Sequence, residues 1–153
     1  MKPKPGQDAP DFTMEADDGS TVSRESLLGE RYVLYFYPKD DTTGCTAQAC
    51  SMRDNYERVT SAGIRVFGVS PDSIKSHVKF RDKYDLPFTL LADTDHHVAE
   101  QYGVWGEKKY RGRSYLGVKR WTFVIDEDGN VKKVFPDVKP AEHADNVLAV
   151  LKA

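Results

Sequence analysis

The two cysteines of the chain, Cys45 and Cys50, are the residues best suited to chemistry. A thiol becomes a nucleophile when it ionises, and the free N–H groups and dipole at a helix N-terminus favour that anion. Cys45 is expected in the first turn of a helix, facing inward. Cys50 falls about 140° around the same helix, on its polar side. The spacing therefore predicts an activated thiol at Cys45 and a second thiol without that activation.

Structural roles for the two cysteines compete with this interpretation. Cys45 could be a small buried apolar residue, and the pair could form a disulfide or half of a zinc site. In an intact helix, however, residues five apart have Cα atoms about 8.7 Å apart, beyond the limit of about 7 Å for a disulfide. A zinc site needs two further ligands, and the histidines show no spacing that pairs with the cysteines: His77, His96, His97 and His143.

The elements around the cysteines are indicated by apolar patterning. An unbroken run of β-branched and aromatic residues at 32–37 predicts a strand buried on both faces, which Pro38 ends. Apolar residues then recur at helical spacing and predict one continuous helix that Gly63 closes. The residues of that stripe are Cys45, Ala49, Met52, Tyr56 and Val59.

The order of the remaining elements predicts an α/β fold. The expected strands are 12–14 and 21–22 in an N-terminal β-hairpin, then 64–69, 88–92, and 121–125 with 131–135 in a second hairpin. The expected helices are a short one after Ser23, one opened by Pro71 and Asp72 and running to about Tyr84, one from about Asp95 to Tyr102, and one from Pro140. His77 is expected on the inner side of its helix, as a histidine at the boundary between core and surface rather than a metal ligand. Residues 104–120 form a long basic loop that is either solvated or attracts anions beside the site.

The residues around Cys45 carry a family resemblance. Pro38-x-x-x-Thr42-x-x-Cys45 resembles the peroxidatic-cysteine motif of the peroxiredoxins, and a second cysteine five residues on resembles the bacterioferritin-comigratory-protein, or peroxiredoxin Q, branch (atypical 2-Cys). The resemblance covers nearly the whole chain, including residues 6–12, 102–109 and 117–126. It implies a thioredoxin-like fold, with a central mixed sheet flanked by helices.

The resemblance also implies a mechanism. Cys45 attacks hydrogen peroxide or an organic hydroperoxide and becomes a sulfenic acid, which Cys50 resolves as an intramolecular disulfide. Thr42 holds the thiolate or the peroxide, Arg120 supplies positive charge, and Pro38 shields the thiol from water. Thioredoxin or a similar dithiol protein is the expected reductant, and no metal or organic cofactor is required.

Three positions depart from the family pattern. Thr43 stands where proline is usual, Gln48 where glutamate is usual, and Trp121 where serine is common. None of them removes a catalytic group. The change at Gln48 puts a polar network through that position in doubt, and Trp121 is expected to reshape the rim of the pocket.

Length and composition limit the other possibilities. The 153 residues suit a single domain spanning 1–153, and a net charge of -2 with a pI of about 6.1 argues against a nucleic-acid binder. No apolar run reaches transmembrane length, and the N-terminus lacks a signal-peptide core. We therefore expect a soluble, cytoplasmic protein with no membrane partner, and the branch that it resembles implies a monomer.

Two rival functions come from other classes. A thioredoxin-like disulfide reductase would carry Cys-x-x-Cys and a neighbouring proline, but four residues separate these cysteines and residues 118–124 contain no proline. A metal- or partner-binding module without enzymatic activity would consume no peroxide.

Overall fold

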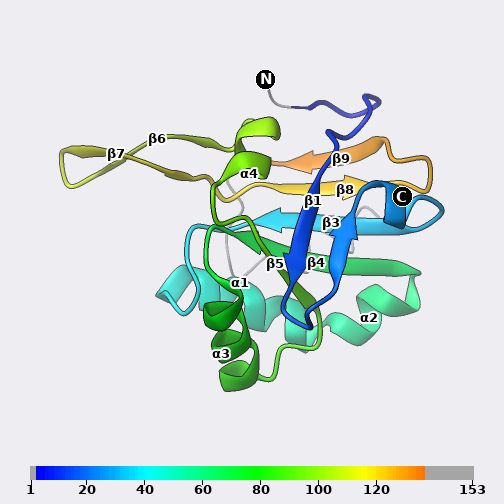
Figure 1. Cartoon of the computed structure of the whole chain (residues 1–153), viewed down its shortest axis with the longest axis horizontal. Coiled ribbons are helices and arrows are strands. Elements are labelled where there is room, and N and C mark those ends of the chain that lie inside the picture. The colour runs from blue at the N-terminus through cyan, green and yellow to red at the C-terminus, as the bar shows by residue number, and fades with distance from the viewer. Residues whose placement is uncertain (1–2, 137–153) are drawn as a thin grey trace.

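The computed structural model describes residues 3–136 of the chain, so the predicted helix from Pro140, with His143, lies outside the described residues. Within that range a seven-stranded mixed sheet has the order β2-β1-β5-β4-β3-β8-β9 (Figure 1). Its strands are β1 (Thr13–Ala16), β2 (Thr21–Ser23), β3 (Arg31–Phe36), β4 (Ile64–Ser70), β5 (Thr89–Ala92), β8 (Thr122–Ile125) and β9 (Val131–Phe135). The predicted N-terminal and C-terminal hairpins are both confirmed.

The strand β3 is the centre of the fold because both of its faces are buried. Successive side chains of a strand point to opposite faces, and here the two sets enter two separate apolar clusters. Val33, Tyr35 and Tyr37 belong to one cluster, and Tyr32, Leu34 and Phe36 to the other. The uninterrupted apolar run is thus explained by burial on both sides.

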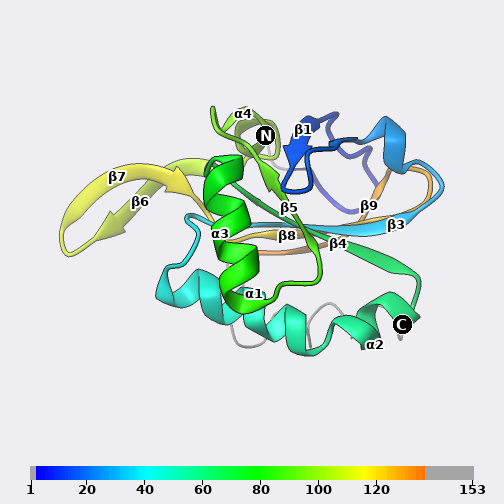
Figure 2. The ribbon, with the colours of Figure 1, turned by 60° about the horizontal axis from the view of Figure 1, so that its bottom comes forward.

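Helices cover both faces of the sheet. The helices α1 (Thr43–Asp54), α2 (Tyr56–Ser61) and α3 (Ile74–Tyr84) contribute to the cluster that contains Tyr35. The short helix α4 (His97–Gln101) and the 3-10 turn η1 (Glu25–Leu27) contribute to the other cluster. Figure 2 shows α4 across the sheet from α1 and α2. This arrangement confirms the predicted α/β architecture. No helix within residues 3–136 is long and apolar enough to cross a membrane.

The prediction of one continuous helix after Cys45 is wrong, because the helix is interrupted at Asn55. The backbone there leaves helical geometry, with φ −114° and ψ 9°. The Asn55 side chain donates a hydrogen bond of 2.9 Å to the Ser51 carbonyl, an acceptor that a continuous helix would offer to the Asn55 backbone N–H. Asparagine side chains compete with the backbone in this way, and apolar spacing does not report the competition.

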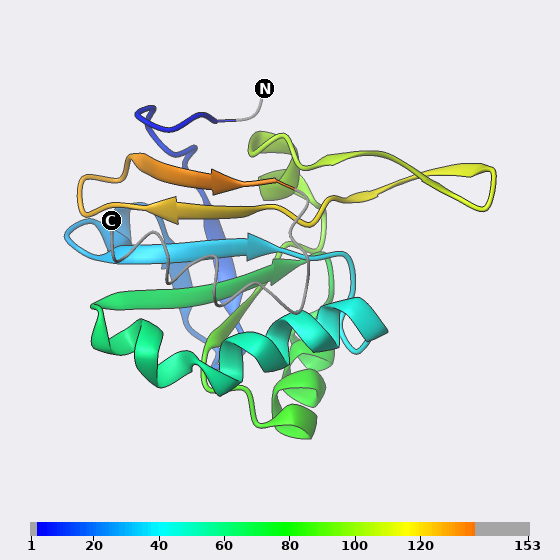
Figure 3. The same cartoon turned by 180° about the vertical axis from the view of Figure 1, so that it is seen from behind.

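The predicted long loop at 104–120 is also wrong, because these residues form a β-hairpin. Its strands β6 (Trp105–Tyr110) and β7 (Arg113–Val118) pair antiparallel and extend away from the main sheet (Figures 1 and 3). The two-residue turn has positive φ at Arg111 (49°) and Gly112 (78°), as a tight hairpin turn requires. Basic residues on both strands conceal the period-two pattern in the sequence.

Two helices start later than predicted. The helix α3 begins at Ile74 because the Ser73 hydroxyl accepts a hydrogen bond of 3.2 Å from the Ser76 N–H and caps the helix there. The helix α4 begins at His97, since His96 has left-handed backbone geometry with φ 49°. Neither shift changes the order of the elements.

The direction of the strands brings distant segments to one edge of the sheet. Since β3, β4 and β5 are parallel, the segments that follow them emerge at the same edge. The strand β8 runs antiparallel to β3, so the residues before β8 reach that edge too, and the Phe36 N–H donates to the Trp121 carbonyl at 2.9 Å. Residues near 40, 70 and 120 therefore meet there.

Candidate active site

Cys45 lies at this edge of the sheet, in the first turn of α1. Its side chain is 1% exposed and belongs to the apolar cluster that includes Tyr35, Ala49 and Met52. The inward helical face predicted from the sequence accounts for this burial. A thiol held there is shielded from water and still adjoins the open end of the helix.

Thr42 is the N-cap residue of α1, but its side chain does not cap the helix. Its hydroxyl instead donates a hydrogen bond of 2.9 Å to the Lys39 carbonyl. The oxygen of that hydroxyl keeps its lone pairs and can still accept a hydrogen bond. The first N–H groups of a helix have no partners within it, so this end can receive an anionic or oxygen-rich group.

Arg120 reaches Cys45 from the segment between β7 and β8. Its Nη1 atom lies 3.3 Å from the Cys45 Sγ atom and 2.9 Å from the Gln48 Oε1 atom. The neighbouring Trp121 packs against the cluster on the opposite face of the sheet. Alternation along the chain thus directs Arg120 toward the thiol and Trp121 away from the face that carries it.

Gln48 is the second partner of Arg120, so position 48 takes part in a polar network although the usual glutamate is missing. Its side chain is fully buried, and its amide oxygen accepts the hydrogen bond from Arg120. Its Nε2 atom has no hydrogen-bond partner among the described residues. Gln48 lies three residues after Cys45 and therefore shares its helix face, so the sequence could have placed it beside the thiol.

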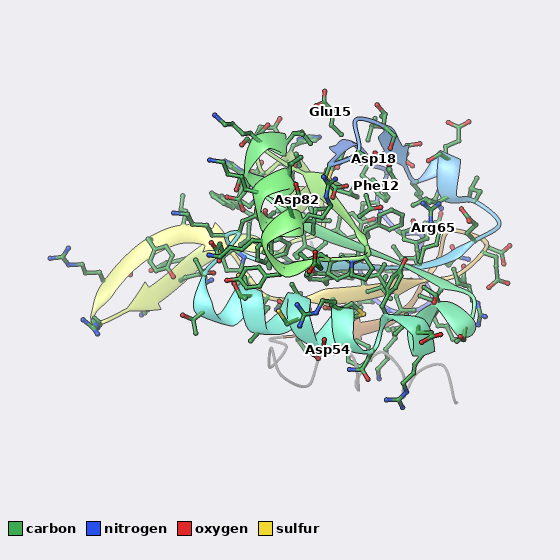
Figure 4. The ribbon with its side chains drawn as sticks, turned by 90° about the horizontal axis from the view of Figure 1, so that it is seen from below. Phe12, Glu15, Asp18, Asp54, Arg65 and Asp82 are labelled. Carbon is green, nitrogen blue, oxygen red and sulfur yellow. The ribbon has the colours of Figure 1, made fainter. Side chains whose placement is uncertain are left out.

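Cys50 lies in the same unbroken helix as Cys45 but on a different side. It is only partly buried, and both thiols are free. The helix continues beyond it to Asp54, which Figure 4 shows on the side of α1 turned away from the sheet. In this form the two sulfur atoms are presented to different environments, as the helical spacing predicted.

Pro38 is partly buried and stands directly after Tyr37, between β3 and α1. Its position beside the loop that leads to Thr42 agrees with the motif spacing, and its shielding role remains a prediction.

His77 is not the boundary residue that the sequence indicated. Its side chain is fully buried, with its Nδ1 atom 2.7 Å from the Asp40 Oδ2 atom. Burial alone would lower the pKa of His77, but the hydrogen bond and negative charge of Asp40 outweigh it, so this pKa is raised. Helical position indicated the inner side of α3, but only the tertiary structure identifies the acidic partner.

Comparison with known proteins places the chain in a family. Residues 5–134 match the AhpC/TSA family, and the chain belongs to that family. It is 49% identical to a putative peroxiredoxin bcp of Coxiella burnetii, over 95% of this chain and 97% of that protein. It is 46% identical to peroxiredoxin Bcp of Escherichia coli K12, over 97% of this chain and 96% of that protein.

Solved structures agree with the sequence comparison. The bacterioferritin comigratory protein of Xanthomonas campestris superposes with a TM-score of 0.89 at 34% identity, covering 97% of this chain and 98% of that one. A mutant of Xylella fastidiosa PrxQ superposes with a TM-score of 0.92 at 27% identity, covering 99% and 97%. The chain is thus a peroxiredoxin of the Bcp, or peroxiredoxin Q, branch, with the thioredoxin-like fold of those structures.

Proposed function

We propose that this thiol peroxidase reduces hydroperoxides through Cys45 and recycles through a Cys45–Cys50 disulfide. The observation that carries the proposal is the contact of 3.3 Å between the Arg120 guanidinium and the buried Cys45 sulfur. A fixed cation at this distance stabilises a thiolate and any negative charge that develops beside it. The X. campestris bacterioferritin comigratory protein has alkyl peroxide reduction activity, which favours organic hydroperoxides alongside hydrogen peroxide as substrates here.

In the first step the Cys45 thiolate attacks one peroxide oxygen and the O–O bond breaks. Sulfur is oxidised by two electrons to a sulfenic acid, and the other oxygen leaves with a solvent proton as water or an alcohol. The Thr42 hydroxyl, whose own proton is donated to Lys39, accepts a hydrogen bond from the peroxide O–H. Arg120 and the open N–H groups of α1 stabilise the oxygen that carries the developing charge, while Pro38 limits access of water.

In the second step Cys50 resolves the sulfenic acid. Its thiolate forms the S–S bond, and the sulfenic oxygen leaves as water after taking up a proton. Both cysteines lie in the intact helix α1, where Cα atoms five residues apart are about 8.7 Å from each other, so the helix must unwind between them. A dithiol protein, thioredoxin or one like it, then returns two electrons and two protons.

Further features of the proposal come from the sequence. We propose that residues 1–153 form one domain, that the protein acts as a cytoplasmic monomer, and that turnover needs no metal or organic cofactor. A compartment rich in reduced dithiol proteins suits a cysteine pair that cycles between thiol and disulfide.

A coupled assay tests the function. NADPH oxidation is followed with thioredoxin and thioredoxin reductase, with and without hydrogen peroxide or an organic hydroperoxide. We expect peroxide-dependent NADPH oxidation by the wild type and none by Cys45→Ser. NADPH oxidation that does not depend on peroxide would favour a disulfide reductase, and none with any peroxide or dithiol donor would reject the proposal.

A further inference from the structure

The loop between β3 and α1 is tied to α3 by a buried group of polar side chains. Asp40 lies in this loop with its side chain 3% exposed. Its Oδ1 atom accepts a hydrogen bond of 2.6 Å from the Tyr37 hydroxyl, and its Oδ2 atom accepts from the Ser76 hydroxyl at 2.8 Å and faces His77 at 2.7 Å. Ser76 and His77 both belong to α3, so this helix supplies two of the three partners of the carboxylate.

The protonation of His77 follows from its two partners. Its Nε2 atom lies 2.9 Å from the Leu91 carbonyl, which can only accept, so Nε2 carries a hydrogen. Its Nδ1 atom faces the Asp40 carboxylate, which already accepts hydrogen bonds from two hydroxyl groups. An N–H at Nδ1 gives this carboxylate a third donor. His77, with a hydrogen on both nitrogens, therefore forms a buried, hydrogen-bonded pair with the Asp40 side chain.

A second tie holds the next residue of the loop. Asp41 has left-handed backbone geometry, with φ 58°, which is uncommon for a residue with a side chain. Its two carboxylate oxygens accept hydrogen bonds of 2.8 Å from Lys83 and Tyr84, in the last turn of α3. The Asp40 backbone N–H donates to Asp72 at 2.8 Å as well, so two consecutive residues of the loop are held from outside it.

The same helix also holds the other end of α1. The Arg53 guanidinium donates a hydrogen bond of 2.7 Å to the Tyr84 carbonyl, at the C-terminus of α3. The interruption at Asn55 follows two residues later. Both cysteines thus lie in a helical segment whose two flanks are tied to α3.

We propose that α3 fixes both flanks of the cysteine helix, with His77 as a positioning residue that acts on Cys45 through Asp40 and the loop 39–42. In the reduced form the ties place Thr42 at the N-terminus of α1. In the oxidised form they hold the flanks in place, so that unwinding is confined to residues 43–52. This inference rests on the proposed Cys45–Cys50 chemistry and adds the boundaries within which it operates.

A metal site is the alternative explanation of the group, because ligand atoms of Asp40, Asp72 and His77 lie within 4.8 Å of one another. The His77 Nδ1 atom, however, faces Asp40 as a donor and has no lone pair to offer. The Asp72 Oδ2 atom is engaged by the Ser70 hydroxyl at 2.6 Å and by the Asp40 N–H. Hydrogen bonding satisfies these atoms and favours a structural tie.

The test measures the loop and the chemistry separately. His77→Leu removes both donors of the imidazole, His77→Asn retains one donor toward Asp40, and Leu27→Ala deletes a buried side chain of the opposite cluster as a matched control. Hydrogen exchange of residues 39–42 is measured without peroxide, in reduced and disulfide forms. Rapid mixing gives the second-order rate of Cys45 oxidation and the first-order rate of disulfide formation.

We expect His77→Leu to speed exchange at 39–42 in both redox forms and to slow Cys45 oxidation by about tenfold, since a displaced helix N-terminus misplaces the reacting groups. His77→Asn should recover part of both effects. Leu27→Ala should change neither, even if it lowers global stability equally. Equal effects of His77→Leu and Leu27→Ala, or unchanged exchange at 39–42, would overturn the proposal.

Two milder variants apply if His77→Leu does not fold. Lys83→Met and Ser76→Ala each remove one hydrogen bond that α3 donates to the loop. Both variants should speed amide exchange at 39–42. If residues 39–42 exchange as slowly in both variants as in the wild type, α3 does not hold the loop. Wild-type protein that consumes no peroxide would reject the proposed function, whereas the exchange of the loop, measured without peroxide, reports on the tie alone.

Discussion

The Nη1 atom of Arg120 lies 3.3 Å from the Sγ atom of Cys45, although 75 positions separate the two residues in the sequence. The contact depends on the antiparallel pairing of β8 with β3, which brings the segment before β8 to the edge where α1 begins. The Cys45 side chain is almost completely buried, so water screens this charge only weakly.

Arg120→Met should slow the oxidation of Cys45 by a factor of about a hundred, because one charge-assisted contact in a dry site is removed. Rapid mixing with peroxide gives the rate, and Lys109→Met serves as a control for the loss of one exposed positive charge. An unchanged rate of Cys45 oxidation would place Arg120 outside the reaction.

Gln48→Leu should slow the same step by about tenfold, since Arg120 loses the acceptor that orients it. Gln48→Glu should retain most of the activity, because a carboxylate oxygen can accept the same hydrogen bond. The comparison is made by single-turnover oxidation of Cys45. If Gln48→Leu reacts as fast as the wild type, the hydrogen bond has no positioning role.

Cys50→Ser should separate the two half-reactions. Cys45 still consumes one equivalent of peroxide, but its sulfenic acid has no partner within the chain. Intact-mass measurement should show the sulfenic acid, followed by over-oxidised forms at excess peroxide. Cys45→Ser, which should consume none, is the control. Undiminished turnover with thioredoxin in Cys50→Ser would show that another thiol resolves Cys45.

Stability should fall as the pH rises above about 6.5, because the pKa of His77 is raised in the fold. The protonated form is favoured by folding, so its contribution is complete below the unfolded value of about 6.5 and is lost as the pH passes through the folded value. Urea denaturation from about pH 6 to about pH 9 should show the loss in the wild type. His77→Asn serves as the reference, because all other titrating groups are the same in both proteins. Parallel curves of unfolding free energy against pH for the two proteins would contradict the expectation.

Oxidation should increase amide exchange in α1, because a Cys45–Cys50 disulfide cannot form within an intact helix. The strands β3 and β8 should keep their protection, since their pairing does not involve α1. Exchange is compared between the reduced protein and the disulfide form confirmed by mass. Equally slow exchange of residues 45–52 in both forms would exclude unwinding as the route to the disulfide.

Patterning predicted the parts of the fold in which one physical effect dominates. The run at 32–37 is apolar because β3 is buried on both faces, and the inward position of Cys45 follows from helical spacing. The hairpin of β6 and β7 escaped prediction because charged side chains obscure its alternation. The interruption at Asn55 depends on a side-chain hydrogen bond that periodicity does not encode.

The family resemblance predicted roles for Thr42, Cys45 and Arg120, whereas the tertiary contacts of these residues could not be predicted from it. The hydrogen bond between Arg120 and Gln48 joins residues 72 positions apart. The hydrogen-bonded pair of Asp40 and His77 joins residues 37 positions apart. Such pairings follow from strand order and register, which become visible only once the sheet is assembled.

The late position of β8 has a consequence for biosynthesis. Chains emerge from the ribosome N-terminus first, so β3 and α1 are made well before the segment that carries Arg120. A nascent chain therefore exposes a Cys45 that lacks its cation, and the thiol acquires its neighbour only when β8 docks against β3. The order of synthesis delays assembly of the reactive centre until the sheet around it is nearly complete.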